Sequence, residues 1–201
     1  MAGGAQPGWN HNTHYHRELL DALPRDASDV LDVGCGAGAL ARELADRGLR
    51  VTAMDVDQPT LERARAHGGD GIAYVLADFM SHDFGAARFD AVLSVAALHH
   101  LDAEAALVRM RDLLRPGGLL GIVGLARSRR AQDLVLDIAA VVPNRWLMAR
   151  RNYAEVTAPT MWPPPLSYAQ IRDLAGGVLP GAQFRRRLFW RYTLTWVKPV
   201  S

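Results

Sequence analysis

The chain of 201 residues is 49% hydrophobic and 22% charged, which is ordinary for one soluble globular domain. No apolar run approaches the ~20 residues that span a membrane, and the first residues lack a basic-then-apolar signal pattern, so we expect a cytoplasmic protein. Cys35 is the only cysteine, which excludes an internal disulfide and a thiolate metal cluster. The net charge of only +2 disfavours a nucleic-acid partner.

The first predicted element is a helix within WNHNTHYHRELLDALP, which ends at Pro24. Thr13 is its expected N-cap, and Tyr15, Leu19 and Leu23 then recur at every fourth position on one face.

Strand-like and helical patterns alternate through the next hundred residues. The strand-like runs are near-continuous apolar segments, at 28–34, 50–57, 72–79, 89–97 and 117–125. Helical patterns separate them at 39–48, 58–68 and 102–118. Continuous apolar strands are typical of parallel sheets that are covered on both faces. The order predicts a single α/β domain with a doubly wound, Rossmann-like sheet.

The last quarter of the chain has a different pattern. We expect an amphipathic helix over 133–150, a proline-broken loop over 157–167 and a helix that Ser167 caps. Two strand-like runs around Trp190 and Arg191 predict an antiparallel hairpin at the edge of the sheet. Residues 185–187 and Arg191 form an arginine cluster, which we interpret as solvated strand surface rather than as a phosphate site.

A glycine-rich turn, Asp32-Val33-Gly34-Cys35-Gly36-Ala37-Gly38, follows the first of these strands and opens a helix. Glycines there allow turn angles that side chains forbid, and they let the backbone approach a ligand closely. The spacing is G-x-G-x-G rather than the G-x-x-G ending of a dinucleotide fingerprint, and no P-loop Lys-Ser/Thr follows. Asp32 suits a cationic amino-acid moiety better than a pyrophosphate. Cys35 is either a redox-sensitive thiol or a small residue that fits the turn.

Acidic side chains also end the next two strands. Asp55 lies about 20 residues after Gly34, where a carboxylate can accept both ribose hydroxyls of an adenosine. Asp78 and Phe79 end the following strand, where an acid can bind the adenine amine and an aromatic ring can cover the base. Three acids at successive strand ends therefore favour an amino acid joined to adenosine.

These motifs resemble those of the class I S-adenosylmethionine-dependent methyltransferases. The matching pieces are VLDVGCGAG, VTAMDVD, LADF, FDAVLSVAALHHLD and LLRPGGLLGIV, in the family's order. The resemblance implies a seven-stranded sheet of order 3-2-1-4-5-7-6 with the last strand antiparallel, and S-adenosylmethionine as cofactor. It also implies a set of cofactor-binding residues, which are Tyr15, Asp32, Gly34, Cys35, Gly36, Gly38, Asp55, Val56, Asp78, Phe79, Ser94, Val95 and Ala96.

The methyl acceptor is less defined. The stretch SVAALHH lacks the Asn/Asp-Pro-Pro-Tyr/Phe motif of enzymes that methylate amino groups of DNA bases and glutamine, and cytosine C5 chemistry needs a catalytic cysteine elsewhere. The stretch resembles the small-molecule branch of the family. His100 and His99 are candidate general bases, and the alternative is that they shape the strand end.

The resemblance further implies an N-terminal lid over the cofactor, in which Tyr15 reaches the methionine carboxylate. His14 is a further catalytic candidate there, and His16 a substrate-lining one. The three histidines at 11, 14 and 16 do not have metal-ligand spacing, so no metal is expected. Other expected substrate-lining residues are Trp146, Tyr153, Met161 and Trp162.

We therefore expect a single methyltransferase domain over 1–201, with a lid helix over 1–24, a cofactor-binding core over 25–125, and a substrate insertion and hairpin over 126–201. The expected reaction is methyl transfer to oxygen or nitrogen of a small molecule, by a monomer or homodimer. The alternatives are an RNA or protein methyltransferase and a non-catalytic module that binds S-adenosylmethionine.

Overall fold

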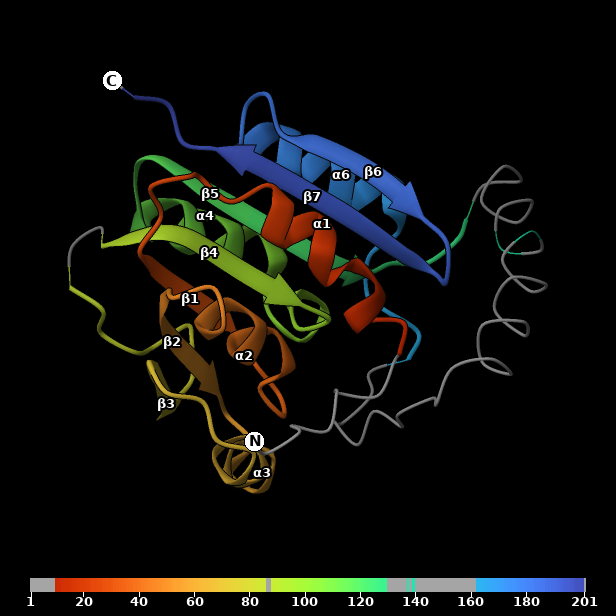
Figure 1. The fold of residues 1–201 in the computed structure, drawn as a ribbon. Coiled ribbons are helices and arrows are strands. Elements are labelled where there is room, and N and C mark those ends of the chain that lie inside the picture. Colours follow the sequence, from red (N-terminus) through yellow and green to blue (C-terminus); the bar gives the residue numbers. More distant parts are fainter. Residues whose placement is uncertain (1–9, 86–87, 130–136, 138, 140–161, 201) are drawn as a thin grey trace.

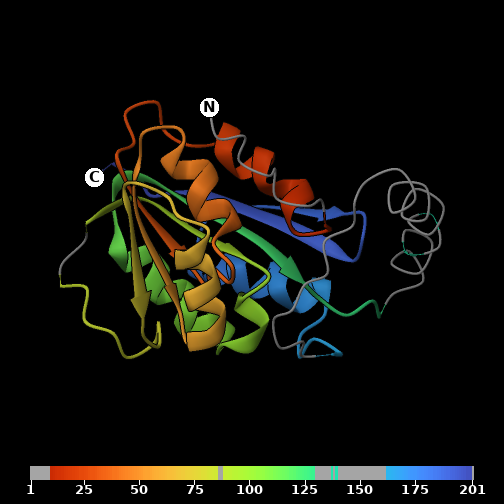
Figure 2. The same cartoon turned by 60° about the horizontal axis from the view of Figure 1, so that its bottom comes forward.

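The computed structural model describes residues 10–85, 88–129, 137, 139 and 162–200, and Figures 1 and 2 show its arrangement. One seven-stranded sheet runs through the molecule in the order β3-β2-β1-β4-β5-β7-β6. The strands are β1 Asp29–Val33, β2 Arg50–Asp55, β3 Ile72–Leu76, β4 Phe89–Val95, β5 Leu114–Leu125, β6 Gln183–Arg187 and β7 Arg191–Val197.

The first five strands pair in parallel, whereas β7 is antiparallel to both β5 and β6. The predicted strand order and the predicted antiparallel hairpin are therefore confirmed. Parallel pairing brings the carboxyl ends of β1, β2 and β4 to one edge of the sheet, which is where ligands bind in open α/β sheets.

Helices cover both faces of the sheet (Figures 1 and 2). One face carries α4 and α6, and the other carries α1 and α2. The helical elements are η1 Thr13–Tyr15, α1 His16–Asp21, α2 Ala39–Ala45, α3 Gln58–Ala66, η2 Leu98–His100, α4 Ala103–Leu113 and α6 Tyr168–Val178. Two separate apolar clusters fill the two faces, which explains why the central strands are apolar throughout.

The ends of the helices follow their local sequence. Ser167 and Gln170 form a capping box at the start of α6, as predicted for Ser167. The prediction for Thr13 was wrong, because Thr13 begins the 3₁₀ turn η1 and exchanges hydrogen bonds with the backbone of Asn10. The Asn10 side chain instead accepts from the N–H groups of Asn12 and Thr13. Most of the expected helix over 133–150 lies outside the described residues.

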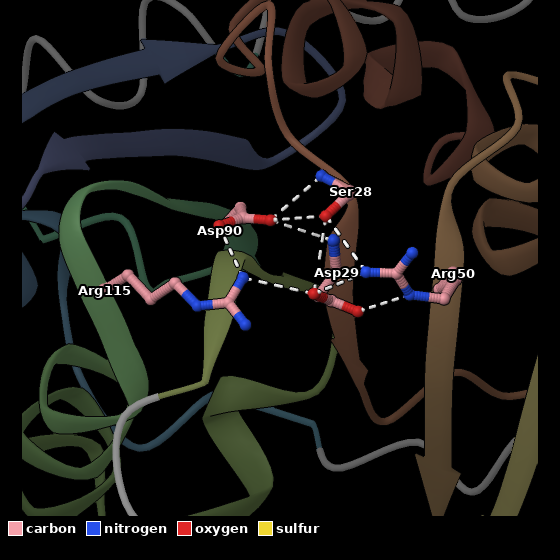
Figure 3. A network of polar contacts seen from close by, with 5 residues as sticks. All are labelled: Ser28, Asp29, Arg50, Asp90 and Arg115. Atoms are coloured by element: carbon pink, nitrogen blue, oxygen red, sulfur yellow. Dashed lines mark hydrogen bonds and ion pairs between the residues drawn. The ribbon is translucent and has the colours of Figure 1, made fainter.

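A polar network joins the amino ends of four strands at the edge opposite the carboxyl ends (Figure 3). Asp90 of β4 accepts from the N–H groups of Ser28 and Asp29, both at 2.9 Å, and from Arg115 of β5 at 2.8 Å. Asp29 of β1 accepts in turn from Arg115 at 3.1 Å and from Arg50 of β2 at 2.8 Å. Burial alone would raise the pKa of Asp90, but these donors outweigh it and lower the pKa to about 2.

Removing the Asp90 carboxylate should destabilise the fold. Asp90→Ala leaves two backbone N–H groups and Arg115 without this acceptor, so we expect a loss of about 1–3 kcal/mol in chemical denaturation at neutral pH. Because the folded pKa lies below the ordinary value of 3.8, the stabilisation is present above about pH 4 and is lost as the pH falls toward 2. The control Asp112→Ala removes an exposed ion pair and should change stability by less than about 0.5 kcal/mol. Equal effects of the two variants would contradict this account.

Candidate active site at the carboxyl ends of β1, β2 and β4

The glycine loop after β1 is a tight turn in which residues with side chains cannot replace the glycines. Gly34 and Gly38 have φ angles of +71° and +75°, and a Cβ on Gly34 would lie 2.3 Å from the Cβ of Ala97. The N–H groups of Gly34 and Cys35 both donate to the Met54 carbonyl at 2.9 Å, which ties the loop to β2. Gly38 then forms the N-cap of α2. The loop therefore passes close beneath the chain that leaves β4.

Asp55 links the end of β2 to this loop. Its Oδ2 accepts from the Gly36 N–H at 2.8 Å, and its Oδ1 accepts from the Asp57 N–H at 3.0 Å. A carboxylate has about four acceptor positions, so both oxygens keep capacity for further donors. The next side chain, Val56, is 68% exposed and offers an apolar surface beside the carboxylate.

Asp32 is a buried carboxyl group near the same loop. It lies in β1 and is only 1% exposed, and within the described part of the chain its Oδ2 has no hydrogen-bond partner. Burial, and secondarily the charge of Asp55, raises the pKa of Asp32 to about 7. A buried acceptor without a donor is costly, and a cationic group placed there would relieve that cost.

The two readings of Cys35 differ in what its thiol can do. Its Sγ lies 3.7 Å from the Gly36 carbonyl oxygen, and burial together with Asp32 and Asp55 raises the pKa of the thiol. A raised pKa disfavours the reactive thiolate, which supports the interpretation as a small residue of the turn.

Asp78 and Phe79 point into different surroundings. Asp78 is exposed at the end of β3, and its carboxylate accepts from the Met80 N–H and the Ser81 hydroxyl, which lower its pKa. Phe79 is 3% exposed and packs in the core, with Arg109 5.5 Å from its ring centre. Contact of either residue with a ligand remains a prediction.

The last residues of β4 and those that follow it form the other wall of the site. The Ser94 hydroxyl is fully buried and donates to the Val33 carbonyl at 3.0 Å, so it joins β4 to β1. Val95 is partly buried, and Ala96 has a left-handed φ of +55° while its N–H donates to the Val123 carbonyl. This strained residue turns the chain toward Ala97, which lies against Gly34.

The histidine pair lies in η2, directly after this turn. His99 is 9% exposed and its Nδ1 has no hydrogen-bond partner among the described residues, whereas His100 is exposed. The two rings lie 4.1 Å apart. Burial, then His100 and Arg191, lowers the pKa of His99 to about 4, so its imidazole is neutral at physiological pH.

The N-terminal segment packs on the β6–β7 hairpin. Tyr15 is 9% exposed, and its hydroxyl donates to the Leu188 carbonyl at 3.1 Å. His14 is exposed, with its ring edge-on to those of Tyr15 and Phe189. His16 is 3% exposed, and its Nδ1 lies 2.9 Å from Glu43 of α2, so it fills the space between two helices. Roles for these residues toward a ligand remain predictions.

Sequence reasoning missed how the hairpin holds this segment. Phe189 and Trp190 both have left-handed φ angles, and Phe189 is 1% exposed, with its ring 5.2 Å from that of His11. Arg191 donates to the Asn12 side chain at 2.8 Å, and Arg187 pairs with Glu18. No local pattern in the sequence signals these contacts, because each joins residues at opposite ends of the chain.

The interpretation of the arginine cluster as solvated surface was wrong for three of its four members. Arg187 pairs with Glu18, Arg191 is 9% exposed, and Arg186 lies 3.9 Å over the ring of Tyr168 and pairs with Asp137. Only Arg185 is exposed, because long-range partners cover the others.

The expected substrate insertion is mostly outside the described residues. Trp146, Tyr153 and Met161 lie there, and Trp162 is 65% exposed. Across the described ranges, no group of three or more His, Cys, Asp or Glu side chains could hold a metal ion. None of the described helices is long and apolar enough to cross a membrane.

A doubly wound sheet with a glycine loop and acids at the ends of β1 and β2 defines a Rossmann-like nucleotide-binding protein. A family model described as a methyltransferase domain matches residues 31–122. An uncharacterized methyltransferase of Mycobacterium bovis is 40% identical over 202 residues, covering 96% of this chain and 98% of the relative. The chain therefore belongs to the class I S-adenosylmethionine-dependent methyltransferase family.

More distant matches agree with this assignment. A ubiquinone biosynthesis O-methyltransferase of Methylocella silvestris is 40% identical over 119 residues, which cover 57% of this chain and 46% of the relative. A solved structure of phosphoethanolamine N-methyltransferase 2 from Haemonchus contortus has a TM-score of 0.66 at 18% identity, covering 96% of this chain and 53% of that protein. At that identity, the structural likeness supports the fold alone.

The raised pKa of Asp32 makes the stability of the ligand-free protein depend on pH. Asp32 keeps its proton in the folded state up to about pH 7 but loses it in the unfolded state near 3.8, so stability should fall between about pH 4 and pH 8. Asp32→Asn cannot ionise and should remove this decline, measured by urea denaturation across that range. The control Asp70→Asn changes an exposed aspartate and should keep the decline. An unchanged slope in Asp32→Asn would contradict the assignment of the raised pKa to this residue.

Proposed function

We propose that this protein transfers a methyl group from S-adenosylmethionine to an oxygen or nitrogen atom of a small-molecule acceptor. The buried Asp32 carboxyl group beside the glycine loop carries the proposal, because its unpaired Oδ2 suits the ammonium group of the methionine moiety. Asp55, whose oxygens keep acceptor capacity, would hold the ribose hydroxyls. The hydrogen-bond acceptors of the site therefore fit the cofactor.

The remaining cofactor contacts follow from the same edge of the sheet. Val56 is exposed beside Asp55 and would pack on the adenine ring, while Asp78 would accept from the adenine amine. Val95 and Ala96 would line the methionine chain, and Ser94 would act indirectly, since its hydroxyl already joins β4 to β1. We propose that the segment before residue 25 closes over this site as a lid, anchored by the contacts of Asn12 and Glu18 with the hairpin.

Bound S-adenosylmethionine supplies an activated methyl group, because the carbon is attached to a sulfonium that leaves as a neutral thioether. The protein's own task is then to hold the acceptor nucleophile in line with the methyl carbon and to exclude water. His100, or His99 beside it, would take the acceptor's proton as the new bond forms. His100 is the better-placed base for an acceptor at the surface, since its ring is exposed.

The preference for a small acceptor is supported by a relative and by the charges. A relative that is 40% identical over 119 residues is named a ubiquinone biosynthesis O-methyltransferase. Arg186, Arg187 and Arg191 have partners within the chain, so these three arginines are not available for contacts with RNA phosphates. Retention on heparin at low salt would favour the RNA alternative.

The ribose assignment is tested by Asp55→Ala. Loss of a carboxylate that accepts two hydroxyls should weaken S-adenosylhomocysteine binding by roughly 30- to 100-fold, or about 2–3 kcal/mol, in calorimetry. Asp70→Ala, at an exposed loop position, is the control and should bind as tightly as the original protein. Undiminished affinity of Asp55→Ala would refute the assignment.

The base assignment is tested by the pH dependence of methyl transfer. If His100 takes the proton, His100→Ala should lose the acidic limb of the kcat profile and lower kcat by roughly 10²- to 10³-fold with the cofactor affinity unchanged. A limb due to His99 would lie near pH 4, since burial lowers its pKa to about 4. An unchanged profile in His100→Ala would reject the role of His100.

A further inference from the structure

A hollow of about 310 Å³ lies beside the candidate site, at the carboxyl ends of β4 and β5. Its walls come from η2, from the start of α4, from one face of α6 and the residues before it, from the last residue of β5 and from β7. The volume is near the lower end of the roughly 300–1,000 Å³ that small-molecule pockets have. The described residues that line it are Leu98, His99, Leu101, Asp102, Ala103, Glu104, Leu125, Pro165, Leu166, Ile171, Leu174 and Tyr192.

The hollow and the glycine loop share one short segment of chain. Ala97 lies against Gly34 of the loop, and His99, two residues further on, lines the hollow. The chain that covers the loop on one side therefore forms a wall of the hollow on the other. This continuity places a small, half-open hollow next to the loop that the cofactor is proposed to occupy.

Most of the described residues that line the hollow are apolar, and the others are His99, Tyr192, Asp102 and Glu104. His99 is 9% exposed, lines the hollow and has no hydrogen-bond partner for its Nδ1 among the described residues. Its imidazole is neutral at physiological pH, because burial lowers its pKa. A buried polar atom without a partner is uncommon in a folded protein, and a ligand group that exchanges a hydrogen bond with it would satisfy it.

The charged side chains among the described lining residues are two carboxylates, while the charge of Arg191 acts on His99 from outside the lining. Asp102 and Glu104 are exposed and line the hollow, and none of the described lining residues is a lysine or an arginine. Carboxylates at the rim repel an anionic ligand and accept a neutral or cationic one.

We propose that this hollow is the acceptor pocket, and that it takes a small, largely apolar molecule that is neutral or cationic and hydrogen-bonds through a hydroxyl or amine group to His99. The inference rests on the proposed function and specifies its substrate class. It assigns different tasks to the two histidines: His99 hydrogen-bonds a polar group of the acceptor inside the hollow, and the exposed His100, whose ring lies 4.1 Å from that of His99, remains the proposed base for the atom that is methylated. It predicts weaker binding of phosphorylated and carboxylated acceptors.

A matched pair of probes tests the charge preference. With the protein saturated by S-adenosylhomocysteine, calorimetry should detect 2-naphthol, and the carboxylate 2-naphthoate should bind at least roughly tenfold more weakly. Equal affinities, tighter binding of 2-naphthoate, or no binding of 2-naphthol would overturn the proposal.

Two substitutions on α4 test the location. Ala103 lines the hollow, whereas Ala105, two positions later, faces a separate surface depression. Ala103→Trp should fill the hollow and reduce 2-naphthol affinity at least roughly tenfold, while Ala105→Trp should leave it unchanged. Unaltered binding in Ala103→Trp, or an equal loss in both variants, would overturn the proposal.

The role of His99 is tested by comparing how His99→Phe changes the affinity of two probes. His99→Phe keeps a ring of similar shape but removes the polar atom, so 2-naphthol should bind roughly three- to tenfold more weakly, while 2-methylnaphthalene binds as before. An equal change for both probes would overturn this part. S-adenosylhomocysteine affinity is measured for every variant: its absence in the original protein refutes the proposed function, whereas retained cofactor binding with failed probe predictions refutes the acceptor pocket alone.

Discussion

The buried carboxyl group of Asp32 imposes the main energetic constraint on this fold. An acid that is 1% exposed and lacks a partner for one oxygen lowers the stability of the fold whenever it ionises. Parallel pairing of β1 with β2 and β4 brings it close to Asp55, whose charge raises its pKa further. The fold tolerates the cost of the buried Asp32 carboxyl group because contacts away from the site stabilise the strands.

The contacts that stabilise the sheet lie away from the site. At the amino ends of the strands, Asp90 and Asp29 accept hydrogen bonds from backbone N–H groups at the start of β1 and from arginines of β2 and β5 (Figure 3). Apolar clusters cover both faces of the sheet, and the Ser94 hydroxyl joins β4 to β1 inside it. The carboxyl edge can therefore keep strained and unsatisfied groups, such as Ala96, Asp32 and His99, which concentrate at functional sites.

The features that sequence reasoning predicted correctly are those with a local physical signature. Continuous apolar runs predicted buried parallel strands, the glycine spacing predicted a tight turn, and Ser167 predicted a helix start. The features that it missed depend on distant residues. Nothing near Arg187 shows that Glu18 pairs with it, and Leu188-Phe189-Trp190 contains none of the usual turn residues. Burial of Phe189 under the N-terminal segment stabilises a turn that local propensity disfavours.

The number of protons exchanged when S-adenosylhomocysteine binds tests the role of Asp32 most directly. Calorimetry at about pH 6 in two buffers of different ionisation enthalpy measures that number. The ammonium group of the ligand would require Asp32 to ionise, and its pKa of about 7 means that most molecules carry the proton before binding. We therefore expect release of close to one proton in the original protein and none in Asp32→Asn. Binding without proton release in the original protein would contradict this role of Asp32.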